Sequence, residues 1–223
     1  MKITKYAQSC GLVETKQGKR ILVDPGDYEF DEKLLDTDWI NIDYIFVTHK
    51  HGDHCYTEII NKIIERDGAK LYTTQEVKES TPELTPEIVK EGDVIDLGEG
   101  LKAEVTKAVH GWIPLFKGGN KFPEENVGYI IDDGDKRAYF TGDTIAFDND
   151  YQCDVIFLPV CGHGLMMGPW EGAMFAKMTE ASIVIPCHAD APKHPVNWDY
   201  VKSEFDSVEV EYKKLVIGES VEI

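Results

Sequence analysis

The chain has 223 residues and carries 23 basic and 41 acidic residues, which give a formal net charge of −18 at pH 7. This length suits one large domain or two closely joined halves, and because no linker or low-complexity tract interrupts it, we expect a single domain over residues 1–223. The acidity, without any cluster of Lys and Arg, argues against a nucleic-acid partner, because proteins that follow nucleic acid need a basic patch.

Residues 1–24 predict three short strands, with turns at residues 7–9 and 16–19. The third strand ends at Asp24 and a Pro-Gly turn. The first residues lead into a strand without the apolar segment of a signal peptide, and no apolar run approaches the ~20 residues that cross a membrane. Five cysteines without a Cys-x-x-Cys pair fit reduced thiols. We therefore expect a cytoplasmic protein with no membrane partner.

Residues 48–55 read Thr-His-Lys-His-Gly-Asp-His-Cys and hold four potential metal ligands: His49, His51, Asp53 and His54. An apolar run before them predicts a buried strand, and helical spacing after them predicts a helix over residues 53–66. The cluster therefore lies at a strand-to-helix turn, where α/β proteins tend to place ligand sites. Imidazole and carboxylate bind Zn²⁺ and similar divalent ions. Three of only seven histidines in this stretch indicate a metal site rather than a loop that is polar by chance.

The middle of the chain predicts mainly strands. Residues 70–73 form a short strand, Thr85 and Pro86 begin a short helix that ends near residue 90, and another strand begins at Val94. A hairpin follows at residues 128–141, around an Asp-Asp-Gly-Asp turn. The loop at residues 111–123 combines Gly, Pro and aromatic residues. We expect it to form a wall or lid of a substrate pocket, with packing on its own domain as the alternative.

Three later predicted strands each end at a potential ligand. Their last residues are His110, Asp143 and His188. Each alone is a weak signal, because an Asp after a strand is usually a turn residue or a helix cap. Together with Asp24, they indicate one shared site. A helix after Pro169, a final helix over residues 197–205 and strands within residues 209–223 complete the expected sheet.

The motif His-x-His-x-Asp-His after an apolar strand resembles the signature of the metallo-β-lactamase superfamily of metallohydrolases, and the later ligand types follow in the order of that pattern. The resemblance covers essentially the whole chain. It implies an α/β fold, a four-layer αββα sandwich, with two metal positions at one edge between the sheets. The implied ligands are His49, His51 and His110 for one ion, Asp53, His54 and His188 for the second, and Asp143 as a bridge between them.

Within the superfamily, the chain looks most like the L-ascorbate-6-phosphate lactonase-like branch, on residues 1–24, 154–169 and 185–188. Many members carry a His near the start, where this chain has Gln8, so the resemblance assigns no contact to that position. Asp24 is expected to orient the ligand loop through hydrogen bonds rather than bind an ion.

Several other residues are candidates with an ordinary structural role as the alternative. His163 is a candidate proton donor or substrate contact, and His194 a candidate substrate-loop residue. Cys55 and Cys187 neighbour predicted ligands, but neighbours on a strand point oppositely, so we expect packed thiols. The remaining candidates, for contact with a phosphate, a carboxylate or an apolar substrate group, are Lys50, Trp112, Leu115, Phe116, Lys117, Lys121 and Lys193.

These features predict a metal-dependent hydrolase in which a hydroxide bound by two ions attacks a small ester, lactone or phosphodiester. Asp53 is expected to bind metal and accept a proton, and His163 is the second candidate catalytic residue. The expected cofactors are two divalent ions, with Zn²⁺ first and Mn²⁺ or Fe²⁺ as alternatives. The expected partner is a small-molecule substrate, and a homo-oligomer is compatible with the sequence.

Two other functions compete with this one. The first is a non-catalytic metal-binding or regulatory module of the same fold, against which the complete ligand set argues. The second is a flavodiiron oxygen or nitric-oxide reductase, which shares the ligand scaffold. Those enzymes resemble a different pattern, with Glu at the position of His51, and they need a flavin-binding domain that this sequence does not show.

Overall fold

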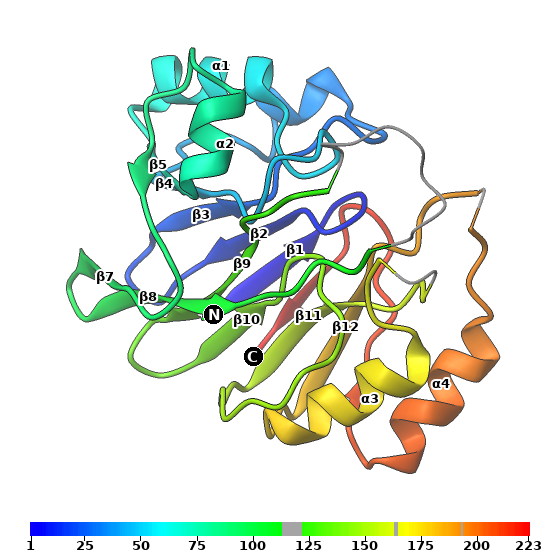
Figure 1. Ribbon diagram of the computed structural model, residues 1–223. Coiled ribbons are helices and arrows are strands. Elements are labelled where there is room, and N and C mark those ends of the chain that lie inside the picture. The colour runs from blue at the N-terminus through cyan, green and yellow to red at the C-terminus, as the bar shows by residue number, and fades with distance from the viewer. Residues whose placement is uncertain (113–121, 163–164, 193) are drawn as a thin grey trace.

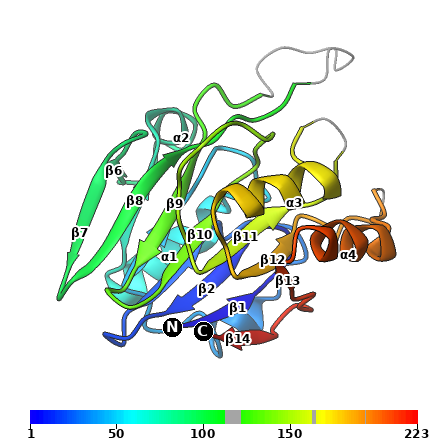
Figure 2. The same cartoon turned by 90° about the horizontal axis from the view of Figure 1, so that it is seen from below.

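The computed structural model describes residues 1–112, 122–162, 165–192 and 194–223. The described residues form two seven-stranded sheets, with helices α1 and α2 on the outer face of the first and α3 and α4 on the outer face of the second (Figure 1, Figure 2). This arrangement confirms the predicted αββα sandwich.

The first sheet has the strand order β14-β1-β2-β3-β4-β5-β6. Its strands are β1 Lys2–Lys5, β2 Gly11–Glu14, β3 Arg20–Val23, β4 Tyr44–Phe46, β5 Lys70–Thr73, β6 Glu87–Ile88 and β14 Ser220–Glu222. The second sheet has the order β13-β12-β11-β10-β9-β8-β7. Its strands are β7 Val94–Gly98, β8 Leu101–Lys107, β9 Val127–Asp132, β10 Arg137–Phe140, β11 Val155–Pro159, β12 Ile183–Cys187 and β13 Glu211–Tyr212. The helices are a 3-10 turn at Glu32–Leu35, α1 Thr57–Asp67, α2 Gln75–Ser80, α3 Pro169–Met178 and α4 Trp198–Ser207.

Alternation along the strands builds three apolar layers. In β3, Ile21 and Val23 pack between the sheets, whereas Leu22 packs under α1 on the other face. In β10, Phe140 lies between the sheets and Tyr139 packs toward α3. Successive strand side chains point to opposite faces, so strands covered on both sides are apolar throughout. The two sheets are thereby held face to face, which fixes where their strand ends lie.

Each sheet joins an antiparallel part to a parallel part. Strands β3, β4, β5 and β6 run parallel in the first sheet, and β10, β11, β12 and β13 run parallel in the second. Each half therefore has its own set of carboxyl-terminal strand ends, the places where α/β folds carry ligand loops.

The prediction of a helix from Thr85 is wrong. Residues Glu87–Ile88 instead form β6, parallel to β5, and Val89 is buried in the layer between the sheets. The helix lies earlier, at α2, where the Thr74 hydroxyl accepts a hydrogen bond from the Val77 N–H. The exposed edge of β5 needs a partner, and this long-range demand outweighs the local helix signal of a Thr-Pro pair.

Two further boundaries differ from the prediction. Helix α1 begins at Thr57 rather than residue 53, because His51 O accepts hydrogen bonds from the N–H groups of His54 and Cys55 and so closes a separate turn. The C-terminal strands do not close one sheet together, since β13 extends the second sheet and β14 returns to pair with β1 of the first. Within the described ranges, no helix is long and apolar enough to cross a membrane.

Candidate metal centre

The seven predicted ligands lie together at one edge of the two sheets. They form two groups, within each of which the ligand atoms lie within 4.8 Å of one another. The loop after β4 supplies ligand types from the first sheet, and the segments after β8, β10 and β12 supply the others from the second. The groups are His49, His51, His110 and Asp143, and then Asp53, His54 and His188.

Asp143 faces both groups. Its Oδ2 lies 3.2 Å from His188 Nε2 and 3.9 Å from His110 Nε2, and its Oδ1 lies 3.3 Å from His54 Nε2. The carboxylate is buried, so solvent screens these contacts little. This is the placement expected of a carboxylate shared between two neighbouring ion positions.

Unsatisfied polar atoms point to an ion at this site. Among the described residues, His54 Nε2, His110 Nε2 and Asp143 Oδ1 are buried without a partner in hydrogen-bonding geometry, although His54 Nε2 and Asp143 Oδ1 lie 3.3 Å apart. Buried polar atoms are nearly always satisfied, so three such atoms in one place need an explanation. Imidazole nitrogen and carboxylate oxygen are the donors that Zn²⁺ and related divalent ions prefer. The residues present therefore fit the implied metal ions.

The outer nitrogens of the ligand imidazoles are held by neighbouring groups. Asp24 Oδ2 lies 2.8 Å from His54 Nδ1 and accepts from the Thr48 hydroxyl, and Oδ1 accepts from the Thr48 N–H at 2.8 Å. His110 Nδ1 lies 2.8 Å from Gly111 O. Such contacts fix ring orientation and leave Nε2 facing the centre. Asp24 therefore contacts the ligand loop through hydrogen bonds, as the sequence predicted, and belongs to neither ligand group.

Burial and neighbouring charges act in opposite directions on these rings. Burial lowers the pKa of His49, and the neighbouring His54 lowers it further, which favours the neutral imidazole that binds metal. Burial also lowers the pKa of His54 and His188, but Asp143 and the other neighbouring carboxylates together outweigh it and hold both above the ordinary value. The two imidazoles in turn hold the pKa of Asp143 well below its usual range, against its burial. Metal binding here must therefore displace protons.

The turn that carries Asp53 packs against the turn after β3. A Cβ atom on Gly26 would lie 1.9 Å from Asp53 O, so only glycine lets the two backbones approach this closely. Tyr56 N–H donates to Pro25 O, and Asp27 N–H donates to Gly52 O, which fastens the turns together. The ligand turn is thus built against a rigid backbone support.

Gln8 reaches the centre although the sequence assigned it no contact. Its side-chain Nε2 lies 3.4 Å from Asp53 Oδ2 and 3.4 Å from His188 Nδ1. The contact joins residues 180 positions apart through the pairing of two loops. No local pattern around Gln8 signals it.

The other candidates have varied outcomes. Lys50 forms a 2.5 Å ion pair with Glu76, so its ammonium group already has a partner in the protein. Cys55 and Cys187 are buried thiols as expected, and burial raises the pKa of Cys55 to about 12. Trp112 and His194 are exposed and belong to neither ligand group. The candidates that lie outside the described residues are Leu115, Phe116, Lys117, Lys121, His163 and Lys193.

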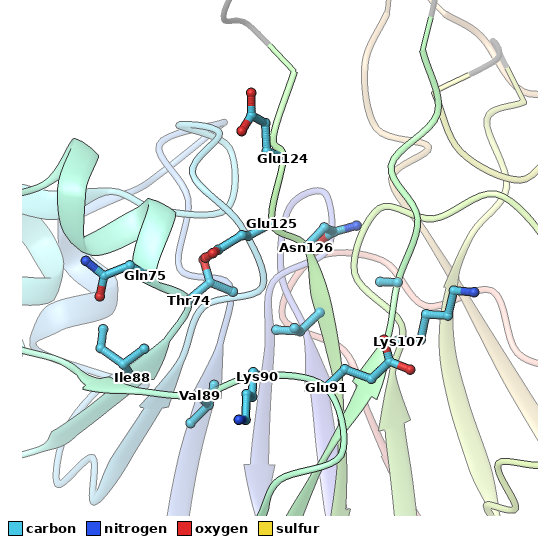
Figure 3. A pocket seen from close by; sticks show the side chains of 12 residues that line it. Thr74, Gln75, Ile88, Val89, Lys90, Glu91, Lys107, Glu124, Glu125 and Asn126 are labelled. Carbon is cyan, nitrogen blue, oxygen red and sulfur yellow. The ribbon is translucent and has the colours of Figure 1, made fainter.

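A cavity of about 450 Å³ lies between the end of β6, the end of β8 and the start of β9 (Figure 3), and none of the seven predicted ligands lines it. Its lining mixes charges of both signs, from Lys90, Lys107, Glu91, Glu124 and Glu125. Asn126 also lines it and donates from Nδ2 to Asp143 O at 2.6 Å. The size is that of a small-molecule site.

Comparison with known proteins gives consistent matches. Residues 2–188 match the family model described as beta-lactamase superfamily domain. A protein named UPF0173 metal-dependent hydrolase from Nanoarchaeum equitans is 28% identical over 212 residues, which cover 92% of this chain and 88% of that protein. A protein of the same name from Anoxybacillus flavithermus is 28% identical over an alignment of 247 positions, which covers 100% of both chains.

Solved structures share the fold. Igni18, a metallo hydrolase from Ignicoccus hospitalis, superposes with a TM-score of 0.80 at 24% identity, over 99% of this chain and 97% of that chain. The isothiocyanate hydrolase from Delia radicum gut bacteria superposes with a TM-score of 0.76 at 18% identity, over 100% of this chain and 99% of that chain.

Proposed function

Because the chain belongs to the family of beta-lactamase superfamily domains, we propose that it is a metal-dependent hydrolase with two ions at the centre described above. One observation carries this proposal: two groups of potential ligands meet at a single buried carboxylate, Asp143, which belongs to the first group and contacts the second, and unsatisfied nitrogen and oxygen atoms lie where they meet. The names of the relatives, which are metal-dependent hydrolases, support the same class of reaction.

In this proposal, His49, His51 and His110 hold one ion, Asp53, His54 and His188 hold the second, and Asp143 contacts both. Zn²⁺ is the first candidate, with Mn²⁺ or Fe²⁺ as alternatives. Ions bound here supply Lewis acidity, which lowers the pKa of a coordinated water and polarises a substrate oxygen.

Asp53 is the residue that we propose to accept the proton of the attacking water. Its side chain is 27% exposed, whereas His54 and Asp143 are almost completely buried. Burial raises the pKa of Asp53, but His54 and His188 outweigh it and keep the carboxyl below its usual range. The group is therefore ionised at neutral pH, which is the form of a carboxyl that can accept a proton.

The proposed substrate is a small ester, lactone or phosphodiester. The cavity that Asn126 links to Asp143 is large enough for such a molecule, and the charge of −18 does not favour a polyanionic polymer. The lactonase-like branch remains a prediction from the sequence. Four buried free thiols suit a reducing compartment, and we propose a cytoplasmic location on that basis.

The test is hydrolysis of three model substrates, a phosphodiester, an aryl ester and a lactone, by metal-loaded protein. We expect one class to be turned over and the rate to fall about 10²–10⁴-fold in Asp53→Ala. His110→Ala should lose bound metal. Asp27→Ala is the matched control, because Asp27 lies in the adjoining turn, is exposed and belongs to neither ligand group.

Full metal content and full activity in both Asp53→Ala and His110→Ala would contradict the assignment. Two bound ions per chain without turnover of any substrate in a broad ester and phosphodiester panel would instead favour the non-catalytic metal-binding module.

A further inference from the structure

Gln8 holds an unusual backbone conformation at a buried position. It lies in the turn after β1, its φ angle is +53°, and its exposed fraction is 3%. Positive φ is uncommon for residues other than glycine and costs free energy. His188, which Gln8 contacts, has a φ of +54°. Two residues with this conformation face each other at the edge of the metal centre.

The backbone of Gln8 is fastened to the segment that carries His188. Gln8 N–H donates to Asp190 Oδ2 at 2.8 Å, and Gln8 O accepts from His188 N–H at 3.2 Å. Lys5 Nζ, on a side chain with an exposed fraction of 3%, pairs with the same Asp190 oxygen at 2.9 Å. A buried charge is tolerated when it is paired and hydrogen-bonded, and here the pair fixes the turn in place. The position of the Gln8 side chain is therefore determined by the fold.

The Gln8 side chain contacts two predicted ligands of the second group. Nε2 lies 3.4 Å from Asp53 Oδ2 and from His188 Nδ1, while Oε1 is buried without a hydrogen-bond partner among the described residues. On the opposite side of its ring, His188 Nε2 lies 3.2 Å from Asp53 Oδ2 and Asp143 Oδ2. His188 thus presents one nitrogen to the centre and the other to Gln8.

The chemistry of imidazole explains how this contact between Gln8 and His188 can orient the ring. An imidazole that binds an ion through Nε2 carries its proton on Nδ1, and that N–H needs an acceptor to fix the ring. The carboxamide has a donor end and an acceptor end, which a rotation about its last bond exchanges. With Oε1 turned toward the ring, the carboxamide accepts from His188 Nδ1–H. With Nε2 turned toward it, as here, the carboxamide can donate to Asp53 Oδ2 or to an unprotonated Nδ1. The Cys161 sulfur, 3.7 Å from Nδ1, is a weaker partner.

We propose that Gln8 is a positioning residue for the second ion position, where its carboxamide fixes the ring of His188. The proposal rests on the function proposed above, because it requires that the second ligand group binds an ion. It adds a residue from the first strand pair to a centre otherwise built from the later loops.

The test is a calorimetric titration of the chelator-stripped full chain with Zn²⁺, followed by the absorption spectrum of the Co²⁺-loaded protein. Gln8→Met keeps the length of the side chain and removes both hydrogen-bonding ends. We expect the second ion to bind about 10–100-fold more weakly and the first within about twofold of the parent. The Co²⁺ spectrum should lose the contribution of the second ion.

Gln8→Glu keeps an acceptor for His188 Nδ1–H and should restore the second affinity to within about threefold of the parent. If Gln8→Met does not fold, Gln8→Asn replaces it, because Asn tolerates positive φ and is too short to reach His188. Gln17→Met is the matched control. Gln17 also donates through Nε2, to Asp133 O, and also has a buried Oε1 without a partner, but it lies in a turn outside both ligand groups.

Three results would overturn the proposal: unchanged binding of both ions by Gln8→Met, equal weakening of both ions, or a Glu variant as weak as the Met variant. An unsubstituted protein that binds only one ion would overturn the two-ion function itself, and the inference with it. The parent titration thus separates failure of the function from failure of the role given to Gln8.

Discussion

Single residues outside the ligand set decide how the ligands point. Asp24 follows β3 with a φ of +48°. Its Oδ1 accepts from the Thr48 N–H, and its Oδ2 contacts both the Thr48 hydroxyl and His54 Nδ1. The sequence could predict this residue, because a polar residue after an apolar strand is a local pattern. It could not predict Gln8, whose role depends on the pairing of two turns far apart in the chain.

Asp24→Asn should weaken metal binding without unfolding the protein. Asn tolerates positive φ and can still accept from the Thr48 N–H, but its amide places a donor where one carboxylate oxygen accepts. His54 then loses its fixed orientation, and we expect the affinity for Zn²⁺ to fall about 10–100-fold. Competition with a chromophoric chelator measures this fall. Asp27→Asn should retain the parent affinity, and an unchanged affinity in Asp24→Asn would exclude an orienting role.

At the scale of elements, the centre depends on turns that are fitted to one another. The turn at residues 24–27 supports the turn at residues 51–56, and the loop after β1 supports the end of β12. The expected helix over residues 53–66 started too early because this turn needs its own hydrogen bonds before α1 can begin. Propensity rules do not contain that requirement, which comes from the positions of the ligands.

Gly26→Ala tests the fit between the two turns. The added methyl group would overlap Asp53 O, so the ligand turn must move. We expect a loss of about 1–3 kcal/mol in the free energy of unfolding, together with loss of the ion bound by Asp53. Urea unfolding and metal analysis measure the two effects. Gly68→Ala is the control: its φ is +70° and no atom lies within 4 Å of the added carbon, so it should lose stability alone. Retention of both ions by Gly26→Ala would refute the support role.

The end of α1 predicts an acid-sensitive contribution to stability. Asp67 accepts hydrogen bonds from Arg66 Nε at 2.7 Å and from the Ile42 N–H at 2.9 Å. The Arg66 contact lowers the pKa of Asp67 from its ordinary value of 3.8, against its partial burial. A carboxyl with a depressed folded-state pKa stabilises the protein above its unfolded-state pKa and loses that effect as the pH falls through the folded-state value.

Asp67→Asn should therefore reduce the loss of stability between about pH 4 and pH 2, while lowering the stability at neutral pH. The measurement is the free energy of urea unfolding against pH, with both proteins stripped of metal so that the centre does not contribute. Parallel curves for the two proteins over the acid range would show that Asp67 has the same pKa in both states.

On the scale of the whole molecule, local patterns predict much of the architecture. Apolar strands that each end at a ligand type, such as those before His110 and His188, indicated one shared site. The two-sheet sandwich and the grouping of the ligands were expected from the resemblance to the superfamily. The return of β14 to β1 and the pairing of β6 with β5 were not predictable in this way. Both satisfy open strand edges, and that demand exists only once the sheets are assembled.

The same assembly predicts that bound ions connect the two sheets and thereby raise the free energy of unfolding. His49, His51, Asp53 and His54 belong to the first sheet, and the remaining ligands follow strands of the second. An unfolded chain cannot present this set, so each ion at about 100 times its dissociation constant should add about 2.7 kcal/mol to the free energy of unfolding, and two ions about 5.4 kcal/mol. For a domain of this size, each kcal/mol changes Tm by about 2–4 °C, so removal of both ions should lower Tm by about 11–22 °C, and removal of one ion by about 5–11 °C.

Differential scanning calorimetry of loaded and chelator-treated protein, with metal analysis of both samples, measures the effect. His188→Ala keeps the first ligand group and should show a smaller decrease in Tm, because it retains a single ion. An unchanged Tm after verified removal of metal would mean that the ions do not connect the sheets. The position of the centre across two sheets would then serve chemistry alone, and the apolar layer between the sheets would hold the fold without help from the ions.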